Sequence, residues 1–481
     1  MPRLHRRTFL QATAAGGLGY LYTAPAFSAD RVIGANDKIR FAGVGVGGKG
    51  RSDIEQAGNL GDVIALVDID ESDAHLGGAA KKWPKAKTFF DYRKLFDDAV
   101  FKDVDAVTIS TPDHHHALVA ANCIRAKKHV YVQKPLTRTV FEAQLLKKLA
   151  ADNKVCTQMG NQGTTENGLR RAVELVQAGT LGDVREVHVW TNRPVWPQAP
   201  DVLGRPKEAP VPKGVHWEEF IGPAPMRPNG VYDESVPRRY GKRTQAYHDF
   251  LWRGWWDFGT GAIGDMACHT ANMAFMALKL GFPTHVTAEA GDVNNETCPS
   301  WAHVTMEFPA RGDMKAVTLH WYEGSRSGYK VTPPSDLVAK ALAIDPDPKR
   351  SKGLVNSGSI MVGSKGLLYS PNDYGADVCV SKNLAEGLNT TTPEKLPVNG
   401  KFDQGQKNEW VEAIRANDAK KALANFDYAS MLTTAFLLGN VAIRTGKGFA
   451  FEPETLTCKG CPEGQQYIKG ESRKGWDMIG G

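Results

Sequence analysis

The chain has 481 residues, of which 42% are hydrophobic and 23% charged, as is usual for a globular protein. This length exceeds the usual size of one hydrophobic core and predicts at least two domains. The formal charge of +6 includes three arginines in an N-terminal segment that we expect to be removed. The other basic residues are scattered among acidic ones, so nucleic acid is excluded as an expected partner.

The N-terminus has the order of features found in an export signal. Arg6 and Arg7 precede a mildly apolar stretch rich in glycine and alanine, and small residues follow at Ala26 and Ser28. This order predicts a twin-arginine signal peptide over residues 1–29 and an exported, periplasmic location. The alternative is a basic, disordered tail. No segment after residue 29 is expected to span a membrane.

Residues 36–155 are predicted to form a Rossmann domain, a doubly wound α/β fold with a parallel sheet. Short apolar runs alternate with stretches that have the three-to-four spacing of helices. Strands are predicted at 39–46, 63–67, 106–109 and 130–132, and helices after Gly48, around Lys81, at 117–126 and at 141–151.

Residues 156–481 are predicted to form an α+β domain for substrate binding and oligomerisation. From about Val184, apolar residues alternate with period two and indicate a large open, mainly antiparallel sheet. Residues 194–237 hold 10 of the 27 prolines and are predicted to be a long functional loop. A second loop, 331–356, is interpreted as a disordered surface insertion rather than a lid.

A glycine motif follows the first predicted strand. Gly45 permits a tight turn, Gly47 and Gly48 leave room for a pyrophosphate, and Gly50 allows the next helix to pack closely. Asp68 ends the second strand, 18 residues after Gly50, where a carboxylate accepts hydrogen bonds from adenosine ribose hydroxyls. Its charge repels a 2′-phosphate, so the expected cofactor is NAD rather than NADP. A strand-end cap is the alternative role for Asp68.

Two more strands deliver polar residues to the carboxyl edge of the predicted sheet. Thr111, Pro112 and His116 follow the fourth strand and are expected to lie near the nicotinamide. His116 is the third of three consecutive histidines, which cannot converge on one ion, and no metal site is predicted anywhere in the chain. Gln133 and Lys134 end the fifth strand, where the lysine is expected to donate a hydrogen bond to a substrate hydroxyl oxygen.

A glycine-rich segment in the second domain precedes a predicted helix that carries three polar residues. Asp265, His269 and Asn272 recur at i, i+4 and i+7 and therefore share one helix face. A neutral histidine can take a hydroxyl proton, and a carboxylate one turn earlier can orient it. A pair that only makes packing hydrogen bonds is the alternative.

The remaining candidates are predicted to contact the substrate. Asn161 lies at the domain crossover, Arg193 and Trp196 lie in the proline-rich stretch, and the tryptophan ring is expected to stack on a sugar. Tyr322 alternates with the apolar Trp321 and is assigned to the cleft. Cys458 and Cys461 form the only close cysteine pair and are interpreted as two free thiols or a local disulfide, without a function.

These motifs resemble those of the Gfo/Idh/MocA oxidoreductases over essentially all of the chain after the signal. The resemblance rests on the glycine motif, Asp68, the Gln133-Lys134-Pro135 segment and the segment from Trp255 to His269. Glutamine stands at position 133 where the family has glutamate. The resemblance implies a homo-oligomer that uses NAD to oxidise a secondary alcohol of a sugar, cyclitol or glycoside.

Three functions remain open at this point. Because free nicotinamide coenzyme is scarce outside the cytoplasm, an exported enzyme is expected to keep its cofactor bound. The first function is net oxidation and reduction of sugars. The second is an NAD-dependent glycosidase such as an α-N-acetylgalactosaminidase, which oxidises, eliminates, hydrates and re-reduces one substrate. The third is a cofactor-binding protein without turnover.

Overall fold

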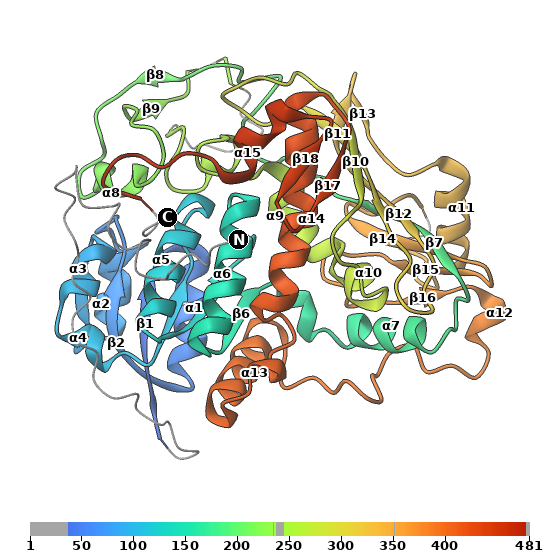
Figure 1. The fold of residues 1–481 in the computed structure, drawn as a ribbon, viewed down its shortest axis with the longest axis horizontal. Coiled ribbons are helices and arrows are strands. Elements are labelled where there is room, and N and C mark those ends of the chain that lie inside the picture. Colours follow the sequence, from blue (N-terminus) through green and yellow to red (C-terminus); the bar gives the residue numbers. More distant parts are fainter. Residues whose placement is uncertain (1–36, 234, 237–244, 351, 478–481) are drawn as a thin grey trace, which may run out of the picture. The chain divides into compact units, whose positions relative to one another are not determined.

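The computed structural model describes residues 37–233, 235–236, 245–350 and 352–477 (Figure 1). The predicted signal peptide, residues 1–29, therefore lies outside the described residues. The first domain is built on a six-stranded parallel sheet in the order β3-β2-β1-β4-β5-β6. Its strands are β1 (Ile39–Val44), β2 (Gly61–Val67), β3 (Lys87–Phe89), β4 (Ala106–Ile109), β5 (His129–Gln133) and β6 (Thr157–Gly160).

Helices cover both faces of this sheet, so its central strands are buried on both sides. The face that includes Phe41 packs against α1, α2 and the much later α13, and the face that includes Val44 packs against α5 and α6. The helices around this sheet, including two short ones not yet mentioned, α3 and α4, are α1 (Gly48–Gly58), α2 (Leu76–Lys82), α3 (Tyr92–Asp97), α4 (Val100–Asp103), α5 (Asp113–Arg125), α6 (Val140–Asn153) and α13 (Phe402–Ala416).

The doubly wound fold is confirmed, and the predicted strands and helices of this domain are all present. The boundary at residue 155 is corrected, because β6 continues the parallel sheet to Gly160. The helix α6 begins with a capping box in which Thr139 and Glu142 bond each other's backbone N–H groups.

The second domain contains a ten-stranded sheet in which all described pairs are antiparallel except β7 with β12. The predicted open, mainly antiparallel sheet is confirmed. Its strands are β7 (Val184–Trp190), β10 (His285–Gly291), β11 (Trp301–Phe308), β12 (Val317–Arg326), β13 (Tyr329–Lys330), β14 (Gly358–Gly363), β15 (Leu367–Ser370), β16 (Cys379–Val380), β17 (Phe449–Glu452) and β18 (Thr457–Lys459).

The two faces of this sheet have different coverings. On the inner face, Trp321 contacts Phe436 of α14, and α9 packs beside it. On the outer face, Tyr322 belongs to a cluster with Leu337 and Ala341 of α11. The helices of this domain are α7 (Asn167–Gln177), α9 (Gly261–Thr270), α10 (Asn272–Ala277), α11 (Ser335–Ile344), α12 (Lys382–Ala385), α14 (Phe426–Thr445) and α15 (Gln465–Lys469).

The segment 331–356, interpreted above as a disordered insertion, instead contains α11, whose apolar side covers the outer face of the sheet. The helix α14 is long and apolar enough to cross a membrane, which the sequence analysis did not anticipate. However, 83% of its most apolar window is buried inside the protein, as in the core helix of a globular domain.

The proline-rich stretch is an insertion between β7 and α9, and we call residues 194–258 the insertion. Where the structure describes it, it contains only short elements, and its backbone pairs with the first domain: Asp70 and Val215 form an isolated antiparallel bridge. The N–H of His216 also donates to the carbonyl of Ile69. The insertion therefore lies against the carboxyl end of β2. The elements among its described residues are β8 (Lys207–Glu208), α8 (Trp217–Ile221), β9 (Gly230–Val231) and the 3-10 helix η3 (Leu251–Gly254).

Candidate active site

The glycine loop between β1 and α1 has the close contacts that require glycine. Gly45 has φ +75°, and a Cβ atom there would lie 2.7 Å from the backbone of Ser110. A Cβ atom on Gly50 would lie 1.9 Å from the carbonyl oxygen of Gly45, so α1 starts directly against the turn. At Gly48, with φ +48°, no atom lies within 4 Å of the corresponding position. The loop is tight where it packs and open at the helix N-terminus, which suits a pyrophosphate.

Asp68 holds this loop in place. Its Oδ2 accepts hydrogen bonds from the N–H groups of Val46 at 2.8 Å and Gly47 at 2.9 Å, while Oδ1 accepts one from Asp70 at 3.1 Å. The imidazole of His75 covers Gly47, where a Cβ atom would lie 1.8 Å from Nδ1. Asp68 is therefore fixed at the end of β2 beside the glycine loop, and its bond to a ribose stays a prediction.

Several predicted site residues carry buried polar atoms that lack a hydrogen-bond partner among the described residues. These atoms are Thr111 Oγ1, Asn161 Nδ2 and His269 Nδ1. A buried polar group without a partner costs about 1–3 kcal/mol, so such groups are expected to meet a ligand or water. The orphaned atoms and the open helix N-terminus fit a bound dinucleotide and its substrate.

His116 joins the two loops that lead into the site. Its Nδ1 and Nε2 each lie 2.8 Å from a backbone carbonyl oxygen, of Pro135 and Thr111 respectively. Burial lowers the pKa of His116 to about 4. The neutral ring has one N–H, so it donates a hydrogen bond to one of these carbonyl oxygens and packs against the other, which links the Thr111-Pro112 segment to the Lys134-Pro135 segment. A contact of His116 with the cofactor stays a prediction.

The other two histidines of the triplet tie the insertion to α5. His114 Nε2 lies 3.0 Å from the carbonyl oxygen of Phe220, and His115 Nε2 lies 2.9 Å from the same oxygen. Burial lowers the pKa of His115 to about 4. These contacts hold the insertion near the predicted cofactor site.

Gln133 bonds a buried carboxylate that the sequence analysis did not identify. Its Nε2 donates to Asp53 Oδ2 at 2.8 Å, and the ammonium group of Lys407 donates to Asp53 Oδ1 at 2.8 Å. Burial alone would raise the pKa of Asp53, but the charges of Lys407 and Lys49 outweigh it and hold that pKa below its usual value. A glutamate at position 133 would stand beside this charged carboxylate, which accounts for the departure from the family motif.

Lys134 and Asp265 meet across the two domains. Lys134 Nζ donates to Asp265 Oδ1 and to its backbone carbonyl oxygen, both at 2.8 Å. Arg253, from the insertion, donates to the same Oδ1 at 3.2 Å. Burial would raise the pKa of Asp265, but the charges of Lys134 and Arg253 outweigh it and hold that pKa below its usual value. The carboxylate thus orients the lysine, whereas the sequence analysis assigned it to the histidine.

His269 lies on the same helix, α9, which is buried along its entire length. Burial lowers the pKa of His269 well below its usual value, and the charge of Lys134 lowers it further. The ring therefore stays neutral at pH 7 and can accept a proton. Tyr374 packs edge-on against it, with the ring centroids 4.9 Å apart. Neither Tyr374 nor Arg253 has a sequence pattern that would have identified it.

Asp113 adds a second carboxyl group to this site. It is buried at the start of α5, where Thr260 Oγ1 donates to its Oδ2 at 2.8 Å. Burial raises the pKa of Asp113 to about 7, and the Asp265 carboxylate contributes to the increase. The site therefore contains one ionised carboxylate and one carboxyl group that titrates near neutral pH.

Asp113→Asn is expected to reduce the pH dependence of stability. Because the folded-state pKa of about 7 exceeds the ordinary value of 3.8, the folded protein retains a proton that the unfolded chain releases. The wild type therefore loses stability as pH rises through this window. The stability of the variant relative to wild type should increase by about 3 kcal/mol between pH 5 and pH 8, from about 1.4 kcal/mol per pKa unit. Denaturant unfolding of both proteins at pH 5 and pH 8 measures this change in relative stability. A stability difference that is the same at both pH values would contradict the prediction.

Two predicted substrate contacts do not face this site. Tyr322 lies on the outer face of the sheet, where its hydroxyl group bonds His188, because the side chains of β12 alternate and Trp321 takes the inner face. Trp196 is 1% exposed and bonds Gln198, so its ring has no open face for a sugar.

Asn272 is also engaged within the protein. The predicted single helix is interrupted, because α9 ends at Thr270 and α10 starts at Asn272. Asn272 Nδ2 donates to Thr164, and its Oδ1 accepts a hydrogen bond from Tyr428 at 2.6 Å. These bonds join α10 to its neighbours, and a contact of Asn272 with the substrate stays a prediction. Arg193 contributes positive charge near His269 and remains a predicted substrate contact.

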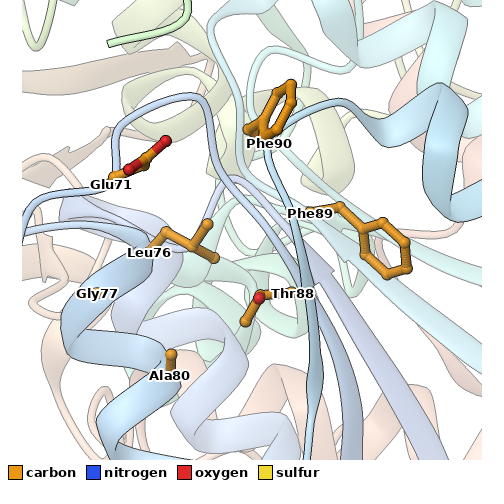
Figure 2. A pocket seen from close by; sticks show the side chains of 7 residues that line it. All are labelled: Glu71, Leu76, Gly77, Ala80, Thr88, Phe89 and Phe90. Carbon is orange, nitrogen blue, oxygen red and sulfur yellow. The ribbon is translucent and has the colours of Figure 1, made fainter. Parts of the chain in front are cut away.

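A separate cavity of about 280 Å³ lies between α2 and β3, lined mainly by apolar atoms (Figure 2). Glu71 and Phe90 line it, and His216 of the insertion contacts both, stacking on Phe90 with centroids 3.8 Å apart. The catalytic candidates do not line this cavity.

At the other end of the chain, Cys458 and Cys461 are both free thiols, in agreement with the first of the two interpretations.

The glycine loop, the carboxylate after β2 and the lysine at the end of β5 together define an NAD-binding oxidoreductase domain. The chain belongs to the Gfo/Idh/MocA family. Residues 39–161 match the model of an oxidoreductase family with an NAD-binding Rossmann fold, and residues 173–318 match the model of its C-terminal alpha/beta domain.

Curated relatives match over part of the chain. A glycosyl hydrolase family 109 protein of Shewanella sp. (strain MR-4) is 30% identical over 210 residues, which cover 38% of this chain and 45% of the relative. An alpha-N-acetylgalactosaminidase of Shewanella oneidensis is 29% identical with the same coverage. The chain thus spans about half the length of the curated relatives it matches.

A solved structure matches the fold more completely. The WlbA dehydrogenase of Chromobacterium violaceum, crystallised with NADH and UDP-GlcNAcA, aligns with a TM-score of 0.57 at 15% identity. The alignment covers 88% of this chain and 99% of that one. It establishes the arrangement of the parallel sheet and the large second sheet as a shared fold.

Proposed function

We propose that the protein oxidises a secondary alcohol of a sugar, cyclitol or glycoside with NAD as the hydride acceptor. The observation that carries this proposal is the hydrogen bond between Lys134, after β5, and Asp265 on α9. The same helix carries the neutral His269. These groups come from both domains and meet at the carboxyl edge of the parallel sheet, where ligands of open α/β folds bind.

Each residue has a distinct role in the proposed reaction. NAD supplies the hydride acceptor when it is bound. Burial and Lys134 keep the pKa of His269 low, so the ring is in its base form. In this form it takes the hydroxyl proton of the substrate. Lys134 donates a hydrogen bond to the same oxygen and stabilises the negative charge that develops on it. Asp265, held by Lys134 and Arg253, keeps the ammonium group directed at the site.

We further propose that the mature protein is exported by the twin-arginine pathway with its cofactor already bound. Arg6 and Arg7, followed by small residues, support the export route. The bonds from His114 and His115 to Phe220 hold the insertion beside the cofactor site and support retention. A homo-oligomer is also proposed, since strands β10 and β11 expose a polar outer face that α11 leaves open.

A second function is favoured by the relatives that match part of the chain. One of them is named an alpha-N-acetylgalactosaminidase. A retained cofactor supports this alternative, because the same molecule can oxidise the sugar and later reduce it, with elimination and hydration of the glycoside in between. The site would then catalyse net hydrolysis instead of net oxidation.

One experiment separates these functions. The mature protein is purified without added cofactor, its NAD(H) content per chain is measured, and p-nitrophenyl glycosides are screened with and without an acceptor sugar. Bound NAD(H) with oxidation only in the presence of an acceptor supports the oxidoreductase. Aglycone release without acceptor supports the glycosidase. Absence of any conversion by protein that contains NAD(H) would overturn both and favour a binding protein.

A further inference from the structure

Asp70, His75 and His248 gather beside the carboxyl end of β2, although His248 is 178 residues from Asp70. Asp70 follows β2, His75 caps α2, and His248 belongs to the insertion. One ligand atom from each residue lies within 4.8 Å of the other two. The three side chains have no part in the mechanism proposed above. We propose that they bind a divalent transition-metal cation of the zinc class.

The distances suit a small coordination sphere. Asp70 Oδ2 lies 2.8 Å from His248 Nε2 and 3.7 Å from His75 Nε2. Tetrahedral zinc with bonds of about 2.0–2.1 Å separates its ligand atoms by about 3.3 Å, and these two distances each differ from that spacing by roughly 0.5 Å. Asp249 Oδ2, 3.8 Å from His75 Nε2, can supply a fourth ligand. Imidazole and carboxylate ligands suit Zn²⁺ and its first-row neighbours.

Neighbouring groups already orient these ligands. Asp70 Oδ1 accepts the N–H of Ser72 at 2.8 Å, so Oδ2 is the oxygen that faces the two imidazoles. His75 Nδ1 lies 3.4 Å from Asp68 Oδ1 and has no hydrogen-bond partner among the described residues. When Nε2 binds a metal, Nδ1 carries the proton of the ring, and the Asp68 carboxylate accepts a hydrogen bond from this N–H. This is the carboxylate–histidine–metal arrangement that fixes the ligand tautomer in metal sites.

Charge also favours a cation at this place. The carboxylates of Asp68, Asp70 and Asp249 all approach His75, and the ligand groups of Asp70 and His75 are largely buried. A divalent ion bound at Nε2 would offset this negative charge in place of a proton on the His75 ring. It would also link the insertion to the nucleotide-binding domain through His248, beside the backbone bridge of Asp70 with Val215. The expected effect of the metal is therefore to stabilise the contact of His248 with the nucleotide-binding domain.

The test uses full-length mature protein without an affinity tag. After treatment with EDTA and dialysis, ZnCl₂ is added, and bound zinc per chain and the thermal unfolding midpoint are measured with and without NAD. We expect one zinc ion per chain and a higher midpoint, because a ligand that binds only the folded state stabilises it. His75→Ala and His248→Ala should each lose this ion and the increase in midpoint.

A matched control comes from the same insertion. His216→Ala removes a histidine that bonds Glu71 outside the cluster, at 2.6 Å, and should leave zinc binding unchanged. If His75→Ala does not fold, Asp70→Asn tests the same ligand set with a conservative change. Absence of zinc binding by the wild type, or equal zinc content in the His248→Ala variant, would overturn the proposal. Neither readout depends on catalysis, so the result is independent of the proposed oxidoreductase activity.

Discussion

His269→Ala is expected to lower kcat by about 10²–10⁴-fold while leaving NAD(H) bound, because a positioned general base contributes about this factor. The substituted side chain belongs to α9 of the second domain and is not part of the glycine loop, so the cofactor content per chain should match that of the wild type. The rate is measured on the substrate identified in the glycoside screen, and the cofactor by absorbance after the protein is denatured.

The pH profile adds an independent check on His269. Burial and Lys134 lower its pKa, so the base form persists to lower pH than for an ordinary histidine. The acidic limb of the kcat/KM profile should therefore lie below pH 6.5, the usual histidine pKa. His285→Ala, on β10 and outside the site, serves as the control and should retain full activity. Full turnover by the His269 variant would remove this residue from the mechanism.

Asp53→Asn is expected to lower the free energy of unfolding by about 3–5 kcal/mol. Asp53 and Lys407 are both fully buried, and removal of one partner leaves the other charge uncompensated in the interior. The effect is measured by denaturant unfolding at pH 7. The double variant Asp53→Asn with Lys407→Met should recover much of the loss, since it removes both charges.

The exposed pair of Lys148 and Asp152 provides the control for this prediction. These side chains form an i,i+4 ion pair on the surface of α6, and such pairs contribute about 0.3–0.5 kcal/mol. Asp152→Asn should therefore change stability little. A similarly small effect of Asp53→Asn would mean that the buried pair does not stabilise the nucleotide-binding domain.

Much of the first domain could be predicted because its signals are local. Gly45, Gly50 and Asp68 lie within one βαβ unit, and the apolar period of each strand and helix identifies the element. Lys134 and Asp265 could also be singled out, each from its own motif. Their mutual hydrogen bond could not, since 131 residues separate them and no local pattern records a contact over such a distance.

The errors have specific physical causes. Tyr322 was assigned to the cleft because alternation shows that it opposes Trp321, but alternation alone does not show which face of a sheet meets the active site. Trp196 lies in a proline-rich segment that is largely exposed, but its own ring packs in a buried cluster with Leu251 and Ala262. The amide of Asn272 bonds Thr164 and Tyr428, which lie far from it in the sequence, so no local pattern could reveal that it is engaged.

The buried pair of Asp53 and Lys407 also has a consequence for the order in which the chain folds. The Rossmann sheet is complete at Gly160, but Lys407 follows Asp53 by 354 residues and reaches it from α13. During synthesis, the N-terminal domain must therefore wait for its fully buried cationic partner, with Lys49 as the cation already beside Asp53, until most of the polypeptide has left the ribosome. Isolated residues 37–160 should accordingly be a poor folding unit, and capture of the dinucleotide should be among the last steps of maturation.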